Sequence, residues 1–125
     1  MKVIQTVIVK QVLTEKSRQE LQKQFSSQRL QLQKECDQLR FEQKRMELNK
    51  KSLPSQIQTY ENEMDTRKEK IRNLDFRLEQ LHMLPLGSEI KQQEIQAIID
   101  VGIGDQWNGH DQVIIIEDGK IVDIR

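Results

Sequence analysis

The sequence predicts an α+β fold in which a long antiparallel coiled-coil helical hairpin is inserted into a small antiparallel β module, either a sheet or a small barrel. Three observations predict it. Residues 15–51 contain neither Gly nor Pro and are rich in charged residues and Gln, which is typical of long solvated helices. Val and Ile are concentrated towards the two ends of the chain. Near the middle, Pro54 separates two helical stretches of similar length.

The expected β module takes its strands from both ends of the chain. Residues 2–13 contain six Val or Ile, whose branched side chains pack well on a pleated surface. Residues 94–103 alternate apolar and polar side chains, which indicates a half-buried strand. Segments 112–116 and 120–125 flank an Asp-Gly dipeptide, which is favoured in two-residue turns because both positions accept positive φ. These two segments are therefore expected to pair as a tight hairpin.

The first helix is expected to begin after Thr14, its predicted N-cap, and the second to run over about 55–83, with a reversal at about 50–55. An alternative is one unbroken rod kinked at Pro54 and paired with another chain. The apolar column of the first helix comprises Phe25, Leu32, Leu39, Met46 and Leu53. Its companion column is mostly polar and comprises Leu21, Gln28, Glu35 and Glu42. The heptad positions of the second helix are Ile57, Tyr60, Met64, Arg67, Ile71, Leu74, Leu78 and Leu81. Seven of these eight are apolar, which predicts coiled-coil packing.

The chain is thus expected to have three parts: residues 1–13 as the first strand of the β module, 14–84 as the hairpin, and 85–125 as the remaining strands. Leu30, Phe41 and Leu48 lie off the apolar column of the first helix. Because they have no obvious partner within the chain, we expect a homodimer in which they contact the partner. Pairing with a second subunit would also protect the edges of a small sheet.

The composition limits the classes of partner and compartment. Lys and Arg balance Asp and Glu at 20 each, so no global field directs the chain to nucleic acid or to an anionic membrane. A single cysteine, Cys36, cannot form an internal disulfide and fits a reducing compartment. No apolar run is long enough to span a membrane, and residues 1–13 lack the features of a signal peptide. We therefore expect a cytoplasmic protein without a membrane partner.

Catalytic chemistry is not expected. Hydrophobic residues make up 35% of the chain and aromatics 4%, which disfavours a large core with a deep pocket. Cys36 is flanked by Glu35 and Asp37, and acidic neighbours disfavour a reactive thiolate. The sequence therefore predicts a non-enzymatic protein without a cofactor.

The loop from Asp105 to Asp111 carries oxygen ligands at a spacing that could hold a hard cation. It contains two carboxylates and His110, but it lacks the order of residues that forms a calcium loop, and no metal is expected there. Trp107 is expected to cap the small β core, while the Asp residues serve turns. If exposed, Trp107 would instead mark a contact with a partner.

Basic residues gather at the expected tip of the hairpin. The candidate contacts for phosphate or RNA are Arg40, Lys44, Arg45, Lys50 and Lys51. Within 40–51 only Glu42 and Glu47 oppose them. Such a cluster can bind a phosphate backbone. It is also compatible with a solvated bend whose charges pair along the helix, as Glu47 and Lys51 would.

Several segments resemble the YlqD-like family of small bacterial proteins. They are 84–90 (LPLGSEI), 101–107 (VGIGDQW), 117–125 (EDGKIVDIR) and the VIVK and VLTEK sequences within 7–16. The resemblance implies an N-terminal strand, a long helical hairpin and a small C-terminal β module. It implies no catalytic residues.

The expected function is that of a non-enzymatic cytoplasmic scaffold or adaptor, which self-associates through its coiled coil and binds protein partners through apolar anchors at heptad spacing. The alternative is an RNA- or ribosome-associated factor that uses the basic tip of the hairpin.

Overall fold

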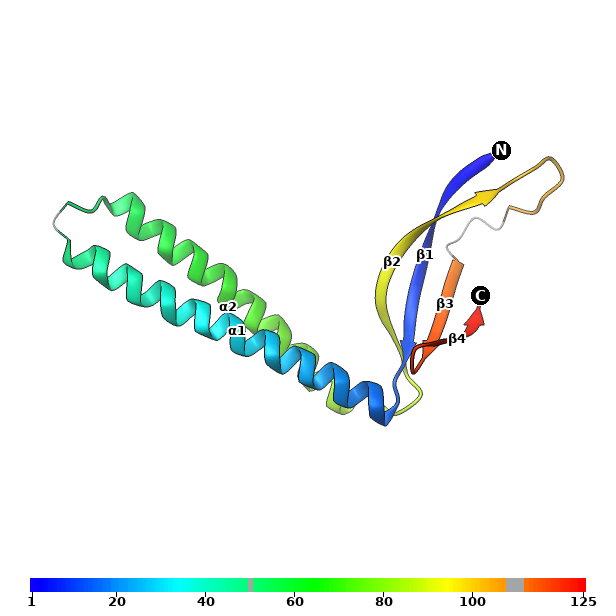
Figure 1. The fold of residues 1–125 in the computed structure, drawn as a ribbon, viewed down its shortest axis with the longest axis horizontal. Helices are drawn as coiled ribbons and strands as arrows, with labels where there is room; N and C mark the ends of the chain where they lie inside the picture. The colour runs from blue at the N-terminus through cyan, green and yellow to red at the C-terminus, as the bar shows by residue number, and fades with distance from the viewer. Residues whose placement is uncertain (50, 108–111) are drawn as a thin grey trace. The chain divides into compact units, whose positions relative to one another are not determined.

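The structure is a computed structural model that describes residues 1–49, 51–107 and 112–125, and it shows an α+β fold. Its elements are β1 (Lys2–Val12), α1 (Glu15–Leu48), α2 (Pro54–Met83), β2 (Glu89–Asp100), β3 (Gln112–Glu117) and β4 (Lys120–Ile124) (Figure 1). The chain divides into two compact units. The sheet unit comprises Met1–Gln19 and Leu84–Arg125, and the hairpin unit comprises Glu20–Met83.

The sheet is mixed rather than antiparallel. Its strands lie in the order β2-β1-β3-β4, with β2 and β4 at the edges of the described sheet. The pairs β1–β2 and β3–β4 are antiparallel, but β1 and β3 are parallel, from Val7 opposite Gln112 to Gln11 opposite Ile116. The prediction of an antiparallel module was wrong at this pair. The chain reverses after β2 and β3 then lies on the far side of β1, so β3 runs in the same direction as β1.

The strand predicted at 94–103 begins earlier and ends earlier than expected. β2 starts at Glu89, and a shift in register leaves Gln92 as the extra residue between Gln93, opposite Val9, and Lys91, opposite Lys10. A bulge of this kind changes the alternation of side chains between the two faces. At the other end, β2 stops at Asp100, and Ile103 is fully exposed.

The register separates charged from uncharged side chains. Residues opposite one another in a ladder point to the same face of a sheet. One face carries Val7 and Val9 of β1 beside Ile95 of β2 and Ile114 of β3. The charged side chains of the four strands all fall on the other face: Lys2, Lys10, Glu89, Lys91, Glu94, Asp100, Glu117, Lys120 and Asp123. The buried apolar residues Val7 and Val9 thus lie on the uncharged face, whereas Ile115 is buried on the charged one.

Two local predictions are confirmed. Asp118 and Gly119 have φ of 48° and 82°, and they join Glu117 to Lys120 as a tight turn. Thr14 caps α1, because its Oγ1 accepts the backbone N–H of Ser17 at 3.1 Å and its own N–H donates to Ser17 Oγ at 2.8 Å. The reciprocal pair satisfies two backbone donors at the start of the helix.

The helices form an antiparallel pair within the hairpin unit (Figure 1). Side chains bridge them from Arg29 to Asp75 at one level and from Gln43 to Glu61 at another, so residue numbers rise along α1 as they fall along α2. Pro54 is the first residue of α2, where its missing N–H costs no hydrogen bond. The alternative of one rod kinked at Pro54 was therefore wrong.

The core of the hairpin uses a different companion column from the one predicted on α1. Leu39 is buried as expected, but the neighbouring buried positions are Cys36 and Gln43. Of the predicted polar column, Gln28 is exposed and Glu35 is half-buried. On a helix, the residues three positions after an apolar column and those four positions after it both lie beside that column. In this hairpin the buried residues Cys36 and Gln43 belong to the set four positions after it. The heptad positions predicted on α2 are all buried or half-buried, with Met64, Ile71, Leu74 and Leu81 buried.

Candidate functional site

The basic residues predicted at the tip lie in the C-terminal part of α1 and in its connection to α2. Arg40, Lys44 and Arg45 are exposed on α1. Lys51 is also exposed, and its backbone N–H donates to Asn49 Oδ1 at 3.1 Å. A guanidinium nitrogen of Arg40 lies 3.9 Å from Asp37 Oδ1, which offsets part of its charge. Lys50 lies outside the described residues.

Three large apolar side chains lie exposed along one line of α1. Leu30, Phe41 and Leu48 are 55%, 59% and 86% exposed. Leu48 is 18 residues from Leu30, which is about five turns of 3.6 residues, and Phe41 lies close to the same line. Leu39 is nine residues from Leu30, two and a half turns away, and lies buried on the opposite side. We call Leu30, Phe41 and Leu48 the apolar stripe, and it faces away from the core of the hairpin.

Trp107, the fourth predicted contact, does not cap the β core. Its side chain is 74% exposed, so that expectation was wrong. The preceding turn is held by Asp105, whose Oδ2 accepts the N–H of Gly102 at 2.7 Å. His110 and Asp111 lie outside the described residues. Across the described ranges, no group of three or more His, Cys, Asp or Glu side chains is placed to hold a metal ion.

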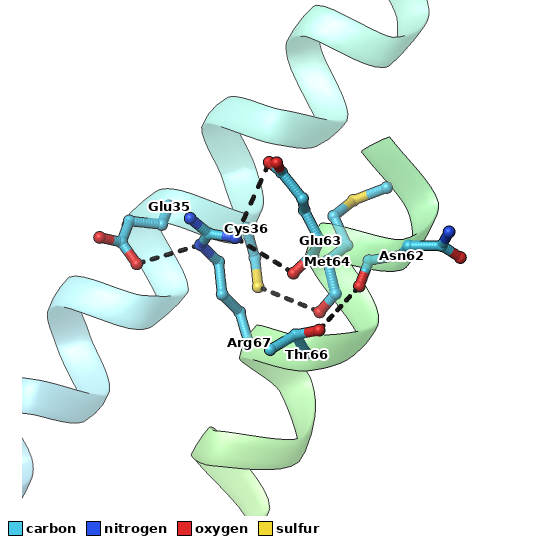
Figure 2. A network of polar contacts seen from close by, with 7 residues as sticks. All are labelled: Glu35, Cys36, Asn62, Glu63, Met64, Thr66 and Arg67. Carbon is cyan, nitrogen blue, oxygen red and sulfur yellow. Dashed lines mark hydrogen bonds and ion pairs between the residues drawn. The ribbon is translucent and has the colours of Figure 1, made fainter. Parts of the chain in front are cut away.

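A polar bridge at the middle of the hairpin was not expected from the sequence. Figure 2 shows Arg67 of α2 reaching across to α1, where its Nε donates to Glu35 Oε2 at 3.2 Å. The same guanidinium donates to the carbonyl of Glu63 at 3.2 Å. Beside it, Cys36 is buried, with its Sγ 4.0 Å from the carbonyl oxygen of Met64. The signal was present in the sequence, since Arg67 is the one charged residue among the heptad positions of α2.

Two open grooves follow the same flank of the hairpin. One has a volume of about 570 Å³ and is lined by Gln28, Leu32 and Leu74, among others. The second, of about 430 Å³, shares Gln31 and Glu35 with the first. The polar column predicted to complete the core thus lines these grooves instead.

A second ion-pair cluster lies in the sheet unit. The guanidinium of Arg125 donates to both carboxylate oxygens of Glu89, at 2.7 and 3.0 Å, and to Asp123 at 2.9 Å. The hydrogen bond from Arg125 lowers the pKa of the Glu89 carboxyl, and the bond to Glu89 raises the pKa of the Arg125 guanidinium. Glu89 belongs to edge strand β2, and Arg125 follows edge strand β4. Side chains therefore link the two edges of the sheet on its charged face.

The arrangement of one strand, a helical hairpin and three further strands matches known proteins over the whole chain. The sequence pattern of the YlqD protein family matches this chain over residues 1–125. The chain belongs to the YlqD family. The relative named "Uncharacterized protein YlqD" from Bacillus subtilis (strain 168) is 37% identical to this YlqD-family chain over 127 residues, covering 100% of this chain and 98% of the relative. The family resemblance seen in the sequence is thereby confirmed.

A solved structure shows the same fold as this member of the YlqD family. It is a crystal structure of a protein of unknown function from Synechococcus sp. WH 8102, with a TM-score of 0.83 and 17% sequence identity. The match covers 100% of this chain and 94% of the other. In the described part of this YlqD-family chain, neither helix has the length and apolar character needed to cross a membrane.

Proposed function

We propose that this YlqD-family protein is a non-enzymatic cytoplasmic scaffold or adaptor, which acts by self-association along its hairpin and by binding protein partners. The observation that carries the proposal is the apolar stripe. Leu30, Phe41 and Leu48 lie on one line of α1, more than half exposed, on the side opposite the core. Exposed apolar side chains that align on one face of a helix are typical of surfaces that bind another helix.

The packing of the hairpin supports a coiled-coil scaffold. Buried positions on both helices recur at heptad spacing, as Cys36 and Gln43 do on α1 and Met64 and Ile71 do on α2. The only thiol, that of Cys36, is buried in this packing, where a substrate has no access to it. A stiff helical pair with a protected core is suited to presenting binding surfaces rather than to catalysis.

Self-association tests the proposal directly. Light scattering of the full chain over a concentration series is expected to show a mass that rises towards that of a dimer, and replacing the three stripe residues with Ser is expected to give a monomer. Circular dichroism serves as the control for folding, because the three exposed side chains contribute little to the core of a single copy. A wild-type chain that remains monomeric throughout a concentration series would refute the proposal.

The alternative function is association with RNA or the ribosome through the tip. It is supported by the exposure of Lys44, Arg45 and Lys51. It ranks second because Asp37 offsets part of the charge of Arg40. Changing Lys44, Arg45 and Lys51 to Glu is expected to abolish salt-sensitive binding to RNA, measured by fluorescence anisotropy. Binding that survives these changes would exclude the tip as the contact.

A further inference from the structure

Two charged residues, Lys34 and Asp37, lie within the apolar stripe on α1. Their positions make this face of the helix complementary to the same face of a second copy. Lys34 and Asp37 lie between Leu30 and Phe41, so the four residues are separated by steps of four, three and four. Alternating steps of four and three follow one seam of a helix, as in a coiled coil. The side chains of Lys34 and Asp37 are both exposed. In order along the helix, the seam is apolar, basic, acidic and apolar.

We propose that two copies of this chain pair antiparallel along this seam, about a twofold axis that passes midway between positions 35 and 36. In this register Leu30 meets Phe41 of the second copy, and Lys34 meets Asp37 of the second copy. The twofold axis repeats each contact, so the pairing has two apolar contacts and two ion pairs. The inference rests on the proposed self-association and specifies its surface and register.

Charge selects this register over its neighbours. Sliding one helix by a heptad in one direction pairs Leu30 with Leu48 of the other copy, but it also brings Lys34 against Lys44 and Asp37 against Phe41. Like charges that meet in this way repel, and the ion pairs are lost. Sliding it in the other direction brings Leu30 against Lys34 and buries no apolar pair. A parallel arrangement in register places Lys34 against Lys34. The antiparallel pairing centred between 35 and 36 matches apolar with apolar and basic with acidic.

The size of the seam sets the strength of the pairing. Leu48 continues the seam and lies opposite Lys23 of the second copy, whose aliphatic stem can cover it while the ammonium group remains in water. The contact thus involves only one face of one helix from each copy. Its buried surface is smaller than the roughly 1,200–2,000 Å² that a standard stable interface buries. We therefore expect a reversible dimer whose population rises with concentration, with the ion pairs fixing its register.

Charge exchange between positions 34 and 37 tests the pairing. Lys34→Glu alone places two acidic pairs across the axis, and Asp37→Lys alone places two basic pairs there. Each variant of the full chain is expected to dimerise about tenfold more weakly than wild type, as measured by analytical ultracentrifugation over a concentration series. An equimolar mixture of the two variants is expected to associate as well as wild type, because every cross-axis pair is then opposite in charge. The double variant Lys34→Glu/Asp37→Lys is expected to recover self-association for the same reason.

The control is Lys68→Glu, which makes the same change at an exposed position of α2 and is expected to leave dimerisation unchanged. Circular dichroism checks that every variant keeps its helices. If wild type dimerises but the single variants do so equally well, or their mixture gains nothing, this seam is refuted while self-association through another surface stands. If wild type is monomeric up to millimolar concentration, both this inference and the proposed self-association fail.

Discussion

Leu30 and Leu39 lie nine residues apart on α1 and on opposite sides of it, and replacing each by Ala tests how the faces of the helix are assigned. Leu39 is 9% exposed and Leu30 is 55% exposed. The substitutions are identical, and both lie far from the ends of α1. Any difference between them therefore reports the packing of the two faces rather than helix propensity.

The expected cost of Leu39→Ala follows from its burial. Burying a Leu side chain is worth about 1.5–3 kcal/mol, and the cavity left by truncation adds to the loss. A core formed by two helices can relax into such a cavity more easily than a globular core, so we expect about 2–3 kcal/mol. Leu30→Ala should change the free energy of unfolding by less than about 0.5 kcal/mol, because its side chain is already largely hydrated and Ala favours a helix.

Urea denaturation followed by circular dichroism measures both values. With a slope of about 2 kcal/mol per molar urea, Leu39→Ala should lower the midpoint by roughly 1 M, and Leu30→Ala should leave it nearly unchanged. The measurement is made at low protein concentration, where a reversible dimer contributes little. Equal shifts for the two variants, or a larger shift for Leu30→Ala, would refute the assignment of the buried face.

Two further predictions concern the sheet unit. Glu89→Gln should lower the unfolding temperature near neutral pH, because the lowered pKa of Glu89 means that its ionised form favours the folded state. This difference from wild type should vanish as pH falls below the ordinary value of 4.5 and through the lowered value of the folded state, and calorimetry that shows an undiminished difference in acid would contradict it. Thr14→Ala should cost about 1 kcal/mol of stability in calorimetry through loss of the cap on Ser17, whereas Thr14→Ser should retain most of it.

The helices were predictable because their signals are local. Absence of breakers, the cap at Thr14 and the break at Pro54 each act within a few residues, and α1 and α2 begin where these signals place them. The choice of companion column on α1 is not local. Phe25, Leu32 and Leu39 have neighbours on both sides, and the partner helix decides which side is covered. Arg29 and Gln43 lie on the side that α2 covers, where they hydrogen-bond to the carboxylates of Asp75 and Glu61.

The strands were harder to predict where the backbone departs from regular alternation. Ile90 and Ile95 lie on the same face of the sheet although five residues separate them, because the bulge at Gln92 shifts the alternation by one. Without the bulge, strict alternation puts Ile90 on the wrong face and predicts a strand that begins after it. The parallel pairing of β1 with β3 depends on contacts between residues about a hundred positions apart, which no local pattern encodes.

The residues of the candidate site were also predictable only where local sequence determines them. Exposure of Leu30, Phe41 and Leu48 was predictable, because they fall outside the apolar column of α1. Exposure of Trp107 was not, since an aromatic residue beside short strands usually packs on them. The link between Glu89 and Arg125 joins residues that become neighbours only when the sheet assembles.

The central position of β1 has a consequence for how the protein is made. Lys2–Val12 leave the ribosome long before Glu89–Asp100 and Gln112–Glu117, the two strands that pair with β1. Until β2 is synthesised, this segment rich in Val and Ile has unpaired backbone on both sides, and one side stays unpaired until β3 follows. Unpaired strand edges of this kind favour aggregation of nascent chains. A message that terminates translation before residue 112 would yield a product that lacks β3. Such a product would be prone to aggregate through the exposed edge of β1.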